Sequence, residues 1–161
     1  MARLDSDFER VALPHARSLL RFALRLTGSS FHAEDLVQET LLLAWRRFGQ
    51  FQPGTNAHAW LFQILMNVFR RERRKGHSLC AAEPLAHALE ATQPPIQESV
   101  EIMQAFDRLG SDQRTVLLLA AIEGFKCREI SEILDVPIGT VMSRLSRARE
   151  VMRELLSEVV P

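Results

Sequence analysis

Hydroxyl and guanidinium side chains recur near the C-terminal end, along a stretch whose apolar residues keep helical spacing. Apolar residues stand at 138, 141, 145, 148 and 152, so they form one stripe on a helix. Arginine pairs with two acceptors of guanine in the major groove, and arginine and hydroxyls also bind phosphates. The polar residues outside the stripe are Thr140, Ser143, Arg144, Ser146, Arg147 and Arg149. They indicate a helix that reads duplex DNA, although the solvated face of an ordinary helical hairpin has a similar composition.

The residues before this helix favour DNA binding over an ordinary hairpin. A short helical segment, residues 127–134, leads through Asp-Val-Pro-Ile-Gly at 135–139 into the long helix. Gly139 and Thr140 are expected to supply the turn and the helix N-cap. Ser131 is small enough for the point where the two helices approach each other. This combination of turn, cap and apolar spacing predicts a helix-turn-helix.

Acidic and amide side chains form a second group of candidates, Asp35, Gln38 and Glu39. Their spacing of i, i+3 and i+4 places them on one side of a helix. Such a group can accept hydrogen bonds from arginines of a partner protein. On spacing alone, a solvated helix face is the simpler interpretation. Acid–base catalysis is a weaker one, because no candidate nucleophile or metal cluster accompanies the carboxylates.

Aromatic and basic side chains occur together in a third segment. Trp60, Phe62 and Phe69 precede five cations within residues 70–75. Aromatic rings stack on unpaired bases while cations hold phosphates; the alternative is that the rings, Phe62 and Phe69 above all, belong to the core. The polar loop at 51–58, with Gly and Pro, could form a pocket, but a lone histidine such as His58 is more often structural.

Helical periodicity runs through nearly the whole chain, which predicts an all-α fold. Pro14 is expected at the first turn of a helix or as the break after a short one. Ser30, Asn56 and Ser111 are expected to cap the helices that follow them. Residues 76–95 read as a linker with room for one loose helix. The expected helices cover about 5–27, 31–48, 56–75, 96–109, 112–123, 127–134 and 138–156.

Charge divides the 161 residues into three parts, although 20 basic and 20 acidic residues give a net charge of zero. Residues 1–75 carry an excess of five positive charges, 76–107 hold five acids and no Lys or Arg, and 108–161 are balanced. We therefore predict two small helical domains, 1–75 and 98–161, joined by a flexible acidic linker, 76–97.

Several classes of protein are disfavoured by the sequence. No apolar run approaches the roughly 20 residues of a membrane span, and the N-terminus does not resemble a signal peptide, so the cytoplasm is the expected location. Cys80 and Cys127 form no CxxC pair and predict neither a disulfide framework nor a zinc site. No cofactor and no metal are expected.

These segments, in this order, resemble the sigma factors of the extracytoplasmic-function group of the sigma-70 family, over about residues 8–75 and 100–156. Residues 33–45 are similar to the family's core-polymerase-binding helix. Residues 51–61 are similar to the loop and helix that open the −10 promoter element, and residues 136–149 to the reader of the −35 element. The resemblance implies a region 2 helical bundle followed by a region 4 helix-turn-helix.

The resemblance also assigns roles to individual residues. Asp35, Gln38 and Glu39 would contact the coiled coil of the polymerase β′ subunit. The −10 element would be bound by Asn56, His58, Trp60, Arg70, Arg71, Arg73 and Arg74. The −35 element would be bound by Thr140, Met142, Ser143, Arg144, Ser146, Arg147 and Arg149. Many members carry Lys or Arg where this chain has Met142, which implies an apolar contact in place of a polar one.

The partners implied are core RNA polymerase (β′ coiled coil and β flap), promoter DNA and an anti-sigma factor of a stress-responsive subgroup, with the chain monomeric when free of them. The acidic linker would thread the RNA-exit region of the polymerase. Two other classes stay open: a one-component regulator that binds an operator as a dimer, and a helical adaptor. A helical enzyme is disfavoured, because the sequence shows no catalytic constellation and no phosphate-binding glycine loop.

Overall fold

The computed structural model describes residues 2–76 and 96–157, with side chains from 6 to 76 and from 101 to 157. Within these ranges the chain forms seven α-helices and one 3-10 turn and no strand, which confirms the predicted all-α class. The predicted loose helix at 76–95 and Cys80 lie outside the described residues. The chain divides into two compact units, residues 1–82 (unit 1) and 83–161 (unit 2), and each is described by itself.

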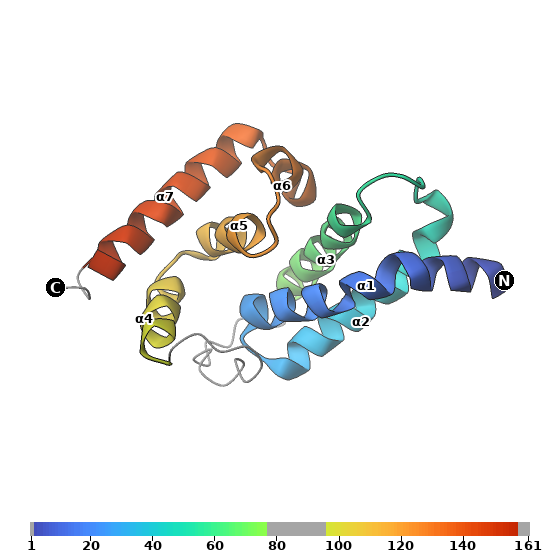
Figure 1. Ribbon diagram of the computed structural model, residues 1–161, viewed down its shortest axis with the longest axis horizontal. Coiled ribbons are helices and arrows are strands. Elements are labelled where there is room, and N and C mark those ends of the chain that lie inside the picture. The colour runs from blue at the N-terminus through green and yellow to red at the C-terminus, as the bar shows by residue number, and fades with distance from the viewer. Residues whose placement is uncertain (1, 77–95, 158–161) are drawn as a thin grey trace. The chain divides into compact units, whose positions relative to one another are not determined.

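Unit 1 is a three-helix bundle in which α1 (Ala2–Thr27) packs against α2 (Ser30–Arg47) and α3 (Ala57–Arg74) (Figure 1). The 3-10 turn η1 (Phe48–Gln50) follows α2 directly. The apolar stripe of α3, which is made of Leu61, Ile64, Leu65 and Val68, is buried. Phe22 of α1 meets Phe62 of α3 edge to face, with ring centroids 5.0 Å apart.

Pro14 lies inside the continuous helix α1, so both expectations for it were wrong. Proline removes one backbone hydrogen bond from a helix interior and usually bends or breaks the helix. Here buried side chains hold α1 on both sides of the proline: Phe8 and Ala12 before it, and Leu19 after it. The ring of Phe8 also packs edge-on against Phe48, at 5.4 Å between centroids. Packing therefore overrides the local preference of the proline.

Of the two helix N-caps predicted in unit 1, the structure confirms one. Asn56 caps α3, because its side-chain oxygen accepts a hydrogen bond from the Ala59 N–H at 3.1 Å. Ser30 does not cap α2. The cap is Ser29, whose Oγ accepts from the His32 N–H at 3.4 Å. Gly28, at a φ of 67°, ends α1 in the left-handed region, and this turn places Ser29 at the start of α2.

Unit 2 packs α4 (Ile96–Asp107), α5 (Ser111–Ala121) and α6 (Cys127–Leu134) against the long helix α7 (Ile138–Ser157). Its core is made of Val116, Leu119, Ile130, Ile133 and Val141. Ser111 is the first residue of α5 rather than its cap. The cap position is Gly110, whose N–H donates to the Gln113 side chain at 3.4 Å.

The turn between α6 and α7 is built differently from the prediction. Asp135, at a φ of 51°, ends α6 in the left-handed region. Ser131 Oγ donates to the Val136 carbonyl at 2.6 Å and holds the turn onto α6. Helix α7 already begins at Ile138, so Thr140 is not the N-cap; its backbone N–H donates to the Pro137 carbonyl at 2.9 Å. Asp135, not a glycine, therefore supplies the unusual backbone conformation.

None of the helices in the described part of the chain is long and apolar enough to cross a membrane.

Candidate functional site

The exposed side of α7 gathers most of the residues predicted to read DNA. Val141, Leu145 and Ala148 face the core and are buried, which turns the other side of the helix outward. Thr140 is only half-exposed. The predicted residues that the structure leaves exposed along the first three turns are Met142, Ser143, Ser146, Arg147 and Arg149.

Arg144 is placed differently from these residues. Its Nη2 lies 2.7 Å from Oδ2 of Asp112, in the first turn of α5, and only 30% of its side chain is exposed. A guanidinium that is half-buried against a carboxylate ties α7 to α5 and has fewer donors left for a ligand. The geometry thus makes Arg144 a residue that orients α7, whereas Arg147 and Arg149 extend from its exposed side.

The exposed side of α2 carries the acidic and amide candidates together with apolar residues that the sequence reading missed. Phe31, Asp35, Gln38, Leu42 and Trp45 are all exposed, Phe31 by 73%. They stand four, three, four and three residues apart, the 3.5-residue period of a seam between coiled helices. The same count along residues 31–45 would have found the row from sequence. We call these five residues the α2 row.

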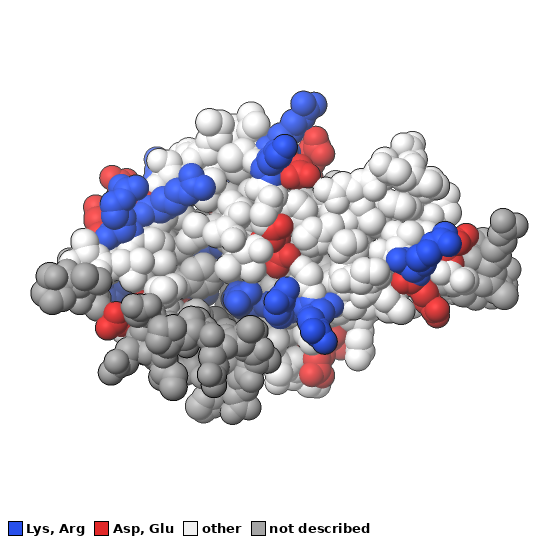
Figure 2. Space-filling model, viewed as in Figure 1, with Lys and Arg blue, Asp and Glu red and all other residues white. Residues whose placement is uncertain are grey.

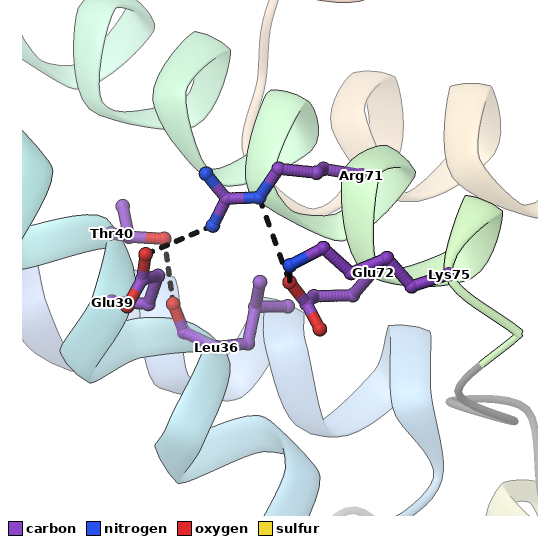
Figure 3. A network of polar contacts seen from close by, with 6 residues as sticks. All are labelled: Leu36, Glu39, Thr40, Arg71, Glu72 and Lys75. Carbon is purple, nitrogen blue, oxygen red and sulfur yellow. Dashed lines mark hydrogen bonds and ion pairs between the residues drawn. The ribbon is translucent and has the colours of Figure 1, made fainter.

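Glu39 lies beside the α2 row and pairs with a residue predicted to contact DNA (Figure 3). Arg71 Nη2 donates to Glu39 Oε1 at 2.9 Å, and Arg71 Nε lies 3.6 Å from Glu72 Oε1. Lys75 Nζ lies 3.3 Å from the same Glu72 oxygen. Arg71 and Lys75 are therefore paired with carboxylates on their own surface. The structure brings a predicted polymerase contact and a predicted DNA contact into one ion pair.

The loop between η1 and α3 borders an open hollow of about 450 Å³. The rings of Phe48 and Phe51 stack beside it with centroids 5.8 Å apart, and the centroids of the Phe51 and Trp60 rings are 4.9 Å apart. Thr55 Oγ1 donates to the Gln52 carbonyl at 2.7 Å and closes the loop. The hollow is lined by Asp7, Arg10, Val11, Phe48, Phe51, Pro53, Gly54, Thr55 and Ala57. Of the predicted −10 residues Asn56, His58 and Trp60, none is among its lining residues.

His58 contributes to the packing of α1 on α3. Its ring stacks on His15 at 5.0 Å and meets Phe62 edge to face at 4.8 Å. Ser18 Oγ lies 3.3 Å from His58 Nε2. Burial, and then the nearby charge of His58, lower the pKa of His15 below its usual 6.5. His58 is thus a half-buried structural residue at the start of α3.

The basic end of α3 lies on the surface of unit 1. Arg71, Arg73 and Arg74 are exposed and Arg70 is half-exposed. The guanidinium of Arg73 lies 5.7 Å from the centre of the Phe69 ring, within reach of a cation–π contact. Phe62 and Phe69 are both buried, which confirms the interpretation that these two rings belong to the core.

A row of arginines on α1 was not singled out from the sequence. Arg17, Arg21 and Arg25 stand four residues apart, and residues 10–29 contain no acid. Arg17 and Arg21 are exposed, and Figure 2 shows basic side chains side by side over this half of α1. The i, i+4 spacing was the signal that the sequence offered for it. In the parts described, no three His, Cys, Asp or Glu side chains gather as a metal site would require.

Comparison with known proteins covers both units. A model described as Sigma-70 region 2 matches residues 12–78, and one described as Sigma-70, region 4 matches residues 99–152. The ECF RNA polymerase sigma factor EcfG of Rhodopseudomonas palustris is 40% identical, over 86% of this chain and 79% of that protein. The ECF sigma factor SigE of Mycolicibacterium smegmatis is 32% identical, over 98% of this chain and 67% of that protein.

Solved structures give the same result for the fold. The sigma factor RpoE of Bartonella quintana, in complex with the anti-sigma factor NepR, aligns with a TM-score of 0.75 at 33% identity, over 94% of this chain and 97% of that one. CnrH, in complex with the cytosolic domain of CnrY, aligns with a TM-score of 0.70 over 96% of this chain and 90% of that one, and at 23% identity supports the fold alone.

Proposed function

The chain belongs to the sigma-70 family, as an extracytoplasmic-function RNA polymerase sigma factor, and on that premise we propose how its two units divide the work. Unit 1 docks on core polymerase and opens the −10 element, and unit 2 binds the −35 element. We keep the predicted boundaries for these roles: 1–75, an acidic linker at 76–97, and 98–161. Sigma factors are initiation factors rather than enzymes, and the cytoplasm is the compartment proposed for this one.

The observation that carries the proposal is that the predicted contact residues lie on the outer sides of α2 and α7. Each of these helices buries its other side in its own unit. Exposed apolar residues amid carboxylates or arginines are typical of surfaces that a partner covers. Both surfaces fall within the residues matched by the two region models.

For polymerase docking, we assign the α2 row together with Glu39. A seam with a 3.5-residue period fits alongside a coiled coil, and the β′ subunit of the polymerase offers one. Asp35 and Glu39 would accept hydrogen bonds from arginines there, while Phe31, Leu42 and Trp45 would supply the apolar contact area. Unit 2 would rest on the β flap, so that both units are held at the spacing of a promoter.

For the −10 element, we assign the loop hollow to an unstacked base and the end of α3 to the strand that carries it. The hollow is bordered by the stacked rings of Phe48 and Phe51, and aromatic rings favour bases of any sequence. Asn56, His58 and Trp60 stay in the proposed set as residues that shape the loop and the start of α3. Arg70, Arg71, Arg73 and Arg74 would hold phosphates.

For the −35 element, we assign Ser143, Ser146, Arg147 and Arg149 to direct contacts, with Thr140 and Met142 at the edges of the same surface. Arg144 would act through its contact with Asp112, which fixes how α7 enters the groove. Residues 108–161, which include the helix-turn-helix, carry equal numbers of acidic and basic residues, and nonspecific affinity comes from neutralised phosphates. The chain should therefore bind DNA poorly without polymerase.

Restraint by an anti-sigma factor is the mode of control that we propose. The Bartonella relative, at 33% identity, was solved in complex with the anti-sigma factor NepR. The α2 row and the exposed side of α7 are surfaces that such a protein would have to cover to block both polymerase and promoter. Free of partners, the chain is proposed to be a monomer.

Run-off transcription tests the proposal. Core polymerase is incubated with and without the protein on fragments of the source genome, and specific start sites are expected only with the protein. Leu42→Ser should reduce the yield by weakening docking. Leu13→Ser, at an exposed leucine of α1, is the matched control and should leave the yield unchanged. If no start site appears and the protein alone shifts specific fragments as a dimer, an operator-binding regulator replaces this proposal.

A further inference from the structure

We propose that Ile138 and Met142 form an apolar contact that reads the C5-methyl group of a thymine in the −35 element. The inference rests on the proposed DNA-binding function of unit 2 and adds to it the chemistry of one base position. The base pair at that position must then be an A·T pair whose thymine methyl faces α7.

The two side chains lie at the end of α7 that would enter the groove. Ile138 is 47% exposed and Met142 is 57% exposed, and residues four apart are neighbours on one side of a helix. They are not part of the core, because Val141 and Leu145 occupy the buried side of the same two turns. Leaving both in water loses the burial free energy of two large apolar groups, so this surface is suited to a bound partner.

The space around the pair allows a close approach. Gly139 lies between the two residues, and an added Cβ there would meet no atom within 4 Å. The missing side chain lets the edge of a base pair or a sugar-phosphate backbone come near the helix. Ser143 and Ser146 follow on the exposed side. The apolar pair is therefore continuous with the hydroxyls that we assign to base contacts.

The chemistry of the major groove selects the ligand. Isoleucine has no hydrogen-bonding group and methionine has only a weak acceptor sulfur, so the pair cannot satisfy the acceptors of guanine or the donors of cytosine and adenine. The apolar group on a base edge in the major groove is the C5-methyl of thymine. A base pair with unmatched polar atoms against these side chains would lose its hydrogen bonds to water. The pair thus favours thymine and disfavours guanine.

Single-atom changes in the promoter test the inference. The −35 element is first defined by selecting promoters from a randomised library with holoenzyme made from core polymerase and the full chain. Each thymine of that element, on either strand, is then replaced singly by deoxyuridine, which removes only the methyl group. For the unchanged protein, one or two positions should lose about four-fold in promoter binding, the factor for about 0.8 kcal/mol per buried methyl-sized group.

Two variants decide whether the pair is responsible. Met142→Ala should bind thymine and deoxyuridine promoters equally at those positions. Ile122→Ala removes a side chain of similar exposure, 49% against 57% for Met142, at the end of α5 and should keep the four-fold difference. Met142→Arg should move the library preference at the same position from thymine to guanine, since arginine pairs with the guanine acceptors.

The inference is overturned if no thymine of the element responds to loss of its methyl group, or if Met142→Ala keeps the difference. A protein partner that covered the pair in place of DNA would give the first of these results. Failure of the proposed function looks different, because holoenzyme would then select no −35 element at all. A selected element that weakens with Arg147→Ala but ignores the methyl group overturns this inference alone.

Discussion

The ion pair between Glu39 and Arg71 allows the stability of unit 1 to be separated from its docking on polymerase. We consider Glu39→Arg, Arg71→Glu and the double variant that exchanges the two charges. Each single variant places two like charges where the structure has a 2.9 Å ion pair. The double variant restores the attraction between α2 and α3 but presents an arginine beside the α2 row instead of a glutamate.

The size of the effect on stability follows from the exposure of the two side chains. They are 42% and 45% exposed, so solvent screens the pair and it contributes about 0.2–1 kcal/mol. In a domain of this size, 1 kcal/mol corresponds to a shift of about 4–8 °C in Tm. The single variants should therefore melt a few degrees lower than the unchanged chain, and the double variant close to it.

Tryptophan fluorescence measures this in the full chain, because both tryptophans, Trp45 and Trp60, lie in unit 1. Binding to core polymerase is measured in parallel by competition with a labelled copy of the protein. The double variant should recover its Tm but not its affinity for polymerase, since the docking carboxylate is gone. If affinity recovers together with Tm, Glu39 serves only to hold α2 against α3, and its assignment as a polymerase contact is wrong.

Three further predictions concern local contacts. The lowered pKa of His15 means that the folded state binds this proton less readily than the unfolded state. Unit 1 should therefore be fully stable above about pH 6.5 and lose stability as the pH falls below it. His15→Gln should make the stability of unit 1, followed by tryptophan fluorescence, less dependent on pH. Asp112→Asn, which removes the partner of Arg144, should lower the free energy of unfolding of unit 2 by up to about 1 kcal/mol in a denaturant titration followed by circular dichroism. Asp135→Gly should raise that free energy by up to about 1 kcal/mol, and Asp135→Val should lower it by about 1–2 kcal/mol, because only glycine is relaxed at a positive φ; equal effects of the two substitutions would contradict the assigned turn.

Periodicity predicted most of the helices because burial follows it. The stripe from Leu61 to Val68 and the short helix at 127–134 are found where the apolar spacing placed them. Caps were less predictable. Ser29 and Ser30 are equally good capping residues, and the choice between them depends on where Gly28 turns the chain. Pro14 shows the same limit, since packing in the folded bundle outweighs its local preference.

The candidate site divides in a similar way. The exposure of side chains on one helix, such as Ser143 and Arg147, could be predicted from their spacing along that helix. The partners of Glu39 and Arg144 could not be predicted in this way. Arg71 is 32 residues from Glu39, Asp112 is 32 residues from Arg144, and each partner lies on another helix. A helical pattern states which side of a helix is apolar, but it does not state which neighbour that side meets.

The core of unit 1 is complete before the helix-turn-helix is synthesised. Its buried side chains run from Phe8 to Phe69, and α3 ends at Arg74, so residues 75–137 are still to be added before α7 begins at Ile138. At about 5–20 residues per second, that takes several seconds, whereas helical bundles fold in microseconds to milliseconds. Unit 1 can therefore fold as it leaves the ribosome and expose the α2 row before the helix-turn-helix has been made. A regulator that recognises unit 1 would gain access to the nascent protein ahead of any promoter.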